Sequence, residues 1–131
     1  MRRTAINPWP WTQKFGFNSA EVVDEPTRLL MCAGQTSLDA EGEVLHPGDM
    51  AAQIGVCMDN VEALLRDADM TWENVVRLNM YTVDVPLFLE NFGAMGERLA
   101  AANVAPPGSL LGVAALAFPE LMVELEVTAA A

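Results

Sequence analysis

Two stretches decide the fold of this chain: AGQTSLDAEGEVLHPGDM, residues 33–50, and PPGSLLGVAALAFPELMVELE, residues 106–126. In the first, an apolar strand ends in glycine, a polar loop follows, and Asp49 offers a side chain that caps helix N-termini. In the second, paired prolines end a connection and two apolar segments follow. The two stretches therefore predict a strand, loop and helix in the first half and a pair of strands at the C-terminus.

Hydrophobic periodicity predicts the strands and the helix in the first half of the chain. Residues 15–23 are expected to form a short strand or hairpin arm, and residues 28–34 an apolar strand. From Asp49 onward, apolar side chains recur at spacings of three and four, which is one face of a helix that excludes Gln53. The members of that face are Met50, Ile54, Cys57, Val61, Leu64 and Ala68.

The same patterns predict a turn, a strand, a second helix and two further strands in the second half of the chain. Residues 71–74 are expected to form a capping turn. Residues 75–83 alternate like a strand, with Val76, Leu78 and Met80 on one side and Arg77, Asn79 and Tyr81 on the other. Asp84 and Pro86 start a second helix, whose apolar stripe holds Phe88, Phe92, Met95 and Leu99. Strands are expected at 109–116 and 122–129.

This order of elements predicts an α+β fold in which one mixed sheet carries both helices on a single face. The chain is expected to be one domain, 1–131. Leu29, Leu30 and Met31 make a strand apolar on both sides, as do Leu110 and Leu111. The sheet face without helices therefore needs another covering, and a symmetric oligomer supplies it.

Composition limits the classes of function. The chain has 131 residues and is 52% hydrophobic, enough for one domain with a core. It has no apolar run near the roughly 20 residues that cross a membrane, and Pro8, Pro10 and Lys14 interrupt any signal-peptide core. We therefore expect a cytoplasmic protein with no membrane partner.

Charge and ligand content narrow the classes further. Seven basic residues face eighteen acidic ones, a net charge of −11, which repels phosphate backbones and disfavours nucleic acid as a partner. A zinc site is not expected, because His46 is the one histidine and the two cysteines are far apart in sequence. Cys32 and Cys57 are expected to be buried free thiols rather than a redox pair.

The shared order and spacing of several short motifs resembles the Rid family, also called YjgF/UK114 and, in older naming, L-PSP endoribonucleases. The resemblance runs from Gly16 to Ala129. It implies a Rid/chorismate-mutase-like fold, a homotrimer with a barrel-like centre, small-molecule clefts between subunits and no cofactor. The motifs are Gly34-Gln35, Gly42-Glu43-Val44, Asp49 with Gln53, Asn60-Val61, Val76-Arg77, Asp84, Pro107 with Ser109, and 123–126.

The best-known branch of this family hydrolyses reactive enamines and imines, and the resemblance implies site residues for that chemistry. Glu124 would point into the cleft and help to place a water molecule, while Glu126, roughly 7 Å along the same strand face, is expected to be structural. One of the two glutamates alternatively pairs with Arg77. Gly34 and Gln35 border the cleft or simply form a tight strand exit.

Phe17 either lines the cleft, as the family's aromatic residue does, or is a core aromatic. Trp9 and Trp11 form an aromatic wall near the cleft or anchor the N-terminal arm on a neighbouring subunit; we favour the second.

One position departs from the enzyme branch of the resembling family. That branch carries an arginine immediately before Ser109, where it grips the substrate carboxylate, and here the residue is Gly108. Leu110 replaces a cysteine that is common in that branch, and Phe92 stands where that branch often has asparagine, so all three changes should make the cleft more apolar.

Arg77 or Arg28 would then have to substitute for the missing cation. Two functions are therefore considered. One is hydrolysis of the enamine/imine deaminase type, and the alternative is a non-catalytic trimer that binds a metabolite or a protein partner.

Overall fold

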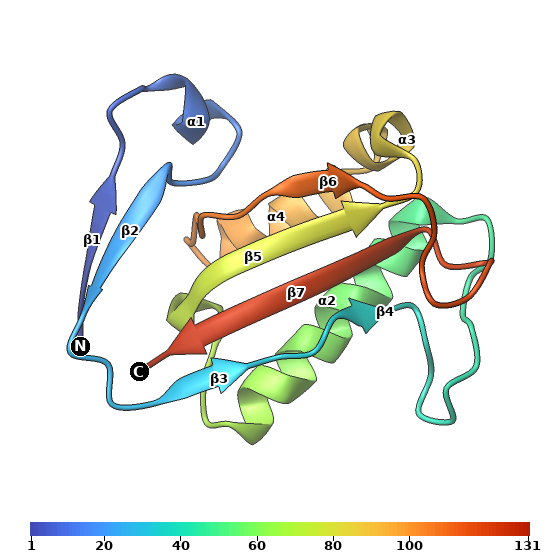
Figure 1. Cartoon of the computed structure of the whole chain (residues 1–131), viewed down its shortest axis with the longest axis horizontal. Helices are drawn as coiled ribbons and strands as arrows, with labels where there is room; N and C mark the ends of the chain where they lie inside the picture. The colour runs from blue at the N-terminus through green and yellow to red at the C-terminus, as the bar shows by residue number, and fades with distance from the viewer.

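The computed structural model describes residues 1–131, and its main body is a five-stranded sheet covered on one face by helices (Figure 1). The strand order is β3 (Leu29–Met31), β7 (Val123–Ala130), β5 (Val75–Thr82) and β6 (Leu110–Gly112). The short β4 (Gln35–Thr36) also pairs with β7. The central strand β7 is antiparallel to β3, β4 and β5, whereas β5 and β6 run parallel. The predicted mixed sheet is confirmed.

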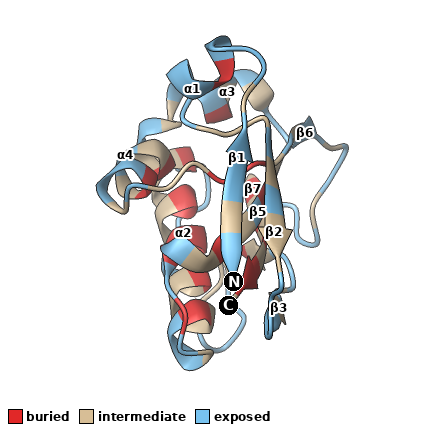
Figure 2. Cartoon of the chain, turned by 90° about the vertical axis from the view of Figure 1, so that its left-hand side faces the viewer, coloured by how far each residue is buried: buried red, intermediate tan, exposed pale blue.

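The helices lie behind the sheet, and their buried residues face it (Figure 2). The long α2 (Met50–Asp67) begins where Asp49 accepts a hydrogen bond from the backbone N–H of Ala52, and α3 (Val85–Glu90) begins at Asp84 in the same way. A short 3-10 helix, η1 (Trp72–Asn74), follows Thr71 with a capping box. Both predicted helix starts and the predicted capping turn at 71–74 are confirmed.

The core lies between these helices and the inner side of β5 and β7. Its fully buried members include Ile54, Cys57, Val61, Phe88 and Val123. Gln53, which we expected off the buried face, is completely buried. Its amide donates to the carbonyls of His46 and Glu120 and accepts from the N–H of Met122, so this polar side chain links α2 to the loop before it and to the loop before β7.

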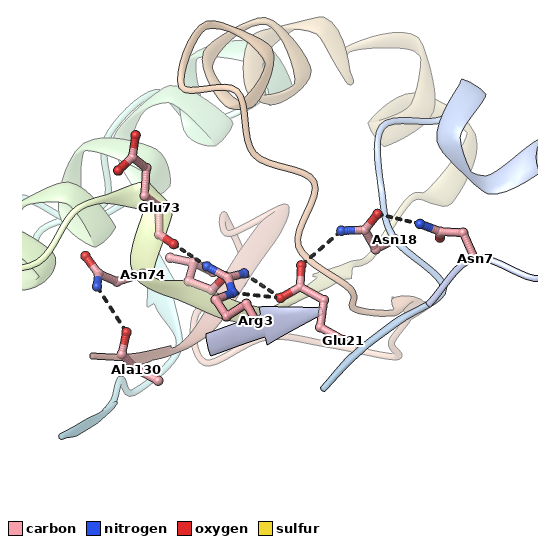
Figure 3. A network of polar contacts seen from close by, with 8 residues as sticks. Arg3, Asn7, Asn18, Glu21, Glu73, Asn74 and Ala130 are labelled. Carbon is pink, nitrogen blue, oxygen red and sulfur yellow. Dashed lines mark hydrogen bonds and ion pairs between the residues drawn. The ribbon is translucent and has the colours of Figure 1, made fainter. Parts of the chain in front are cut away.

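The N-terminal segment forms an arm outside the main sheet (Figure 1). β1 (Arg2–Ile6) pairs antiparallel with β2 (Ala20–Asp24), and α1 (Trp11–Lys14) connects them. The arm is tied to the body by Arg3, which pairs with Glu21 at 2.6 Å and donates to the carbonyls of Glu73 and Val75 (Figure 3). These contacts connect the N-terminal hairpin to η1 and to the start of β5.

Two other boundaries differ from the sequence prediction. The second helix is divided into α3 and α4 (Gly93–Ala101), because the side chain of Asn91 bonds the carbonyl of Leu87 and Gly93 weakens helix propagation. The strand expected at 109–116 covers only Leu110–Gly112. No helix in the structure combines the length and the apolar character that crossing a membrane requires.

Candidate functional site

Chemistry-bearing side chains gather on the sheet face that the helices leave uncovered, which we call the open face. On β5 the buried Leu78 points toward the helices, so Arg77, Asn79 and Tyr81 point the other way. On β7 the same alternation places Glu124, Glu126 and Thr128 on the open face. The register sets Tyr81 opposite Glu124 and Asn79 opposite Glu126, and the two predicted glutamates do share one face.

Glu126 is held by neutral donors from β5. The Tyr81 hydroxyl donates to Oε1 of Glu126 at 2.8 Å, and the Asn79 amide donates to the same oxygen at 3.1 Å. Hydrogen bonds from Asn79 and Tyr81 lower the pKa of Glu126, and the bond to Glu126 raises the pKa of Tyr81. Glu126 is therefore a fixed negative charge at neutral pH, and it pairs with these two residues rather than with Arg77.

Glu124 lies in a different environment only two residues away. Burial, and then the charge of Glu126, raise the pKa of Glu124 above the usual range of a carboxyl group. Its carboxyl group occupies the space beside Gly34. A Cβ atom built on Gly34 would lie 2.5 Å from Cδ and 2.7 Å from Oε2 of Glu124. The glycine predicted as a cleft residue is thus the residue that makes room for Glu124.

Two carboxyl groups with divergent pKa values on one surface are a recurring arrangement for acid–base chemistry. Glu126 keeps its charge, while Glu124 can exchange a proton nearer to neutral pH. Asn79 and Tyr81, which set this difference, were not predicted as site residues. The alternation of residues 75–83 put them on one face, but only the pairing of β5 with β7 shows that they meet Glu126.

Gly108 lies where β6 begins, close against the backbone of β5. A Cβ atom there would fall 1.6 Å from the carbonyl oxygen of Leu78. The neighbouring bonds from Leu78 N–H to Pro107 and from Met80 N–H to Ser109 hold the two chains together. Position 108 therefore has no room for any side chain, and the backbone N–H of Ser109 is already donated to Oδ1 of Asn79 at 3.2 Å.

Three other predicted site residues lie away from Glu124 within the chain. Phe92 and Leu110 pack against the hydrophobic core on the helix side, because Phe92 contacts Phe88 edge-on and Leu110 pairs with the inward-facing Met80. Within the chain they extend the core, and the expectation that they make the cleft between subunits more apolar stays a prediction. Phe17 belongs to the arm, where it contacts Trp11 edge-on at 6.1 Å.

Gln35 and Gly34 line an open hollow of about 650 Å³ between α2 and the loop 38–45. Glu124 is not among its lining residues, although Gly34 borders both. The carboxylates in this hollow are Asp39 and Asp59, and Asp59 is paired with Arg98 at 2.8 Å. The acid–base pair therefore lies outside the hollow. No three His, Cys, Asp or Glu side chains anywhere in the structure are arranged to hold a metal ion.

Residues 16–131 match the family described as endoribonuclease L-PSP. The chain belongs to this family, which is also known as the YjgF or Rid family. One Rid protein of unknown function, YyfB from Yersinia pestis, is 36% identical, with full coverage of both chains and a TM-score of 0.87.

Two further solved structures have the same fold. Rv2704 from Mycobacterium tuberculosis, a member of the YjgF/YER057c/UK114 family, is 26% identical over 99% of this chain and 100% of its own, with a TM-score of 0.67. TdcF from E. coli, solved with bound serine, is 19% identical over 97% of this chain and 91% of its own, with a TM-score of 0.71, which shows the fold alone. A comparison with curated proteins found no match.

Proposed function

We propose that this Rid-family protein is a homotrimer that binds a small metabolite between subunits and hydrolyses a C=N bond beside Glu124. The observation that carries the proposal is the placement of Glu124 and Glu126 on one face of β7, with the carboxyl group of Glu124 packed into the space beside Gly34. Burial and the charge of Glu126 raise the pKa of Glu124, and a carboxyl group with a raised pKa is suited to general acid–base catalysis. TdcF, a protein of the same fold, was solved with serine, a ligand of the size that we propose.

In the proposed reaction, a water molecule attacks the carbon of the protonated C=N bond. Glu124 takes a proton from that water, and a carbinolamine forms. Glu124 then returns the proton to the nitrogen, and the C–N bond breaks while the carbinolamine hydroxyl gives its proton to Glu124. A carbonyl product and an amine or ammonia leave, and the released amine takes up the proton from Glu124 as an ammonium ion. The protonated imine and one water molecule thus balance the carbonyl and the ammonium ion, and no cofactor takes part.

Exposed apolar side chains support the trimer. Leu29, Met31 and Leu111 are 62%, 72% and 51% exposed, and they lie beside the open face. Apolar area of this kind on a sheet without helices is a common mark of subunit contact. Light scattering in dilute neutral buffer should give three times the chain mass of 14.2 kDa. A stable monomer would contradict the intersubunit site.

The reaction itself is tested with imines generated in the assay by an amino-acid oxidase, with semicarbazide as the competing nucleophile. The purified trimer should shorten the lifetime of at least one imine in a panel of different side chains. A trimer that accelerates none of them, yet is stabilised against heat by a carbonyl compound, would be a binding protein and would contradict the catalytic proposal.

Ribonuclease activity, which the family description suggests, is not proposed. The net charge of −11 per chain repels RNA, and no cluster of cations lies on the open face. Short RNA should show no saturable binding at 50 mM salt.

A further inference from the structure

The proposed site has carboxylates but no cation at the position where the enzyme branch of the family carries one. Gly108 cannot be replaced by a longer side chain, because the carbonyl of Leu78 fills the space. We propose that Arg77 instead binds the anionic end of the ligand, and that this anionic group stands several bonds away from the reacting carbon. This inference rests on the proposed site beside Glu124.

Arg77 is the cation that the fold leaves available on the open face. It is exposed, and no hydrogen bond or ion pair holds it in the structure. Each of the other five arginines is occupied: Arg2 by Asp24, Arg3 by Glu21, Arg28 by the carbonyl of Ala68, Arg66 by Asp67, and Arg98 by Asp59 and Glu62. Lys14 ends α1 in the arm.

The register fixes how far this cation lies from the acid–base pair. Arg77 is opposite Thr128, and Tyr81 is opposite Glu124, so four residues of β5 separate the two positions. At the rise of a strand this is roughly 13 Å between the Cα atoms. The α-carboxylate of a 2-imino acid is bonded directly to the reacting carbon, so it lies at the Glu124 end of this distance, whereas a carboxylate several bonds away extends toward Arg77.

Local charge favours the same conclusion. A carboxylate attached directly to the reacting carbon would lie beside Glu124 and the permanently charged Glu126, and like charges in contact repel. A carboxylate several bonds away escapes this repulsion and meets a guanidinium, which binds planar carboxylates through two parallel hydrogen bonds. The ligand class is therefore an imine, or its carbonyl product, that carries a remote carboxylate.

Binding of stable carbonyl compounds tests this inference without catalysis. The probes are 4-oxopentanoate, whose carboxylate is remote from the carbonyl carbon; pyruvate, whose carboxylate is adjacent; and 2-pentanone, which has none. The full-length trimer should bind 4-oxopentanoate at least tenfold more tightly than the other two by calorimetry at low salt.

The variants are Arg77→Met and Arg77→Lys, with Arg66→Met as the matched control, because Arg66 is an exposed arginine on α2. Arg77→Met should weaken 4-oxopentanoate binding at least tenfold, Arg77→Lys should weaken it less, and the control should bind as the wild type does. Light scattering checks that each variant keeps the wild-type mass. If the Arg77→Met trimer dissociates, the binding comparison is made with Arg77→Lys, which keeps the positive charge.

Undiminished binding by Arg77→Met, equal binding of pyruvate and 4-oxopentanoate, or no binding of 4-oxopentanoate would each overturn the inference. The outcomes also separate it from the proposed reaction. Arg77-dependent binding without hydrolysis would leave the inference standing and remove the catalytic proposal. Hydrolysis that needs Glu124 but is unchanged in Arg77→Met would support the catalytic proposal and overturn the inference about Arg77.

Discussion

The carboxyl group of Glu124 lies in the space that a side chain at Gly34 would fill, with Cδ only 2.5 Å from the position of the missing Cβ. The glycine immediately before β4 thus leaves room for an acidic side chain on the neighbouring strand β7. Because burial is the first cause of the raised pKa of Glu124, the same contact also influences its proton affinity.

Gly34→Ala should therefore reduce activity without unfolding the protein. The new methyl group would push the carboxyl group of Glu124 away, and a displacement of about 1 Å can cost on the order of 100-fold in rate. Thermal unfolding should change little, because the flexible end of a side chain can move. Gly55→Ala is the control, since a Cβ atom there meets nothing within 4 Å. Equal activity of the two variants would refute the positioning role.

The pH dependence of kcat/KM should report the two glutamates. A base is active when deprotonated, so the raised pKa of Glu124 moves the acidic limb of the profile to higher pH than an ordinary glutamate gives. Glu126→Gln removes one of the two causes, so the pKa of Glu124 should fall and the limb should move to lower pH. Glu97→Gln, on α4, removes the same charge elsewhere and should leave the limb in place. If the acidic limb of the pH profile does not move in Glu126→Gln, the charge of Glu126 does not influence the pKa of Glu124.

Gly108 should tolerate no substitution. Gly108→Ala forces a Cβ atom into the carbonyl of Leu78, and because backbone must move, we expect a loss of about 1–3 kcal/mol in the free energy of unfolding. Urea denaturation measures this loss. Gly108→Arg should be destabilised as well and should not gain deaminase activity toward 2-iminopropanoate. A stable, active Gly108→Arg protein would contradict the close approach of β6 to β5.

Cys57 should be chemically inert in the folded protein. Burial, followed by the charge of Glu124, raises its pKa to about 12, so the thiolate is scarce at neutral pH. The variant Cys32→Ser leaves Cys57 as the single thiol. It should show no reaction with Ellman's reagent until urea is added, and then one thiol per chain. Prompt reaction of the folded variant would mean that Cys57 is accessible.

Much of the fold follows from local signals in the sequence. Asp49, Thr71 and Asp84 mark helix starts through side-chain capping, and the period of two along β7 puts Glu124 and Glu126 on one face. The family assignment follows from the spacing of the motifs and is confirmed by the match over residues 16–131. The burial of Gln53 was missed because two of its three partners, Glu120 and Met122, are 67 and 69 residues away in the sequence.

The details of the site depend on contacts between strands that no local pattern contains. Asn79 and Tyr81 were visible as one face of a strand, but their partner Glu126 is 47 and 45 residues away. The space at Gly34 depends on the side chain of Glu124, and the lack of space at Gly108 depends on the backbone of Leu78. Each of these relationships exists only once β5, β6 and β7 are placed side by side.

The most direct test of the account is the rate of imine hydrolysis by Glu124→Gln beside Glu126→Gln, on the imine that the wild type hydrolyses fastest. Glutamine keeps the shape of the side chain but cannot accept the proton, so Glu124→Gln should lose about 10²–10⁴-fold in kcat. Glu126→Gln should keep most of the activity, because Glu124 remains as the base and burial, the larger cause of its raised pKa, remains as well. Full activity in Glu124→Gln, with the loss in Glu126→Gln instead, would contradict the assignment of Glu124 as the base.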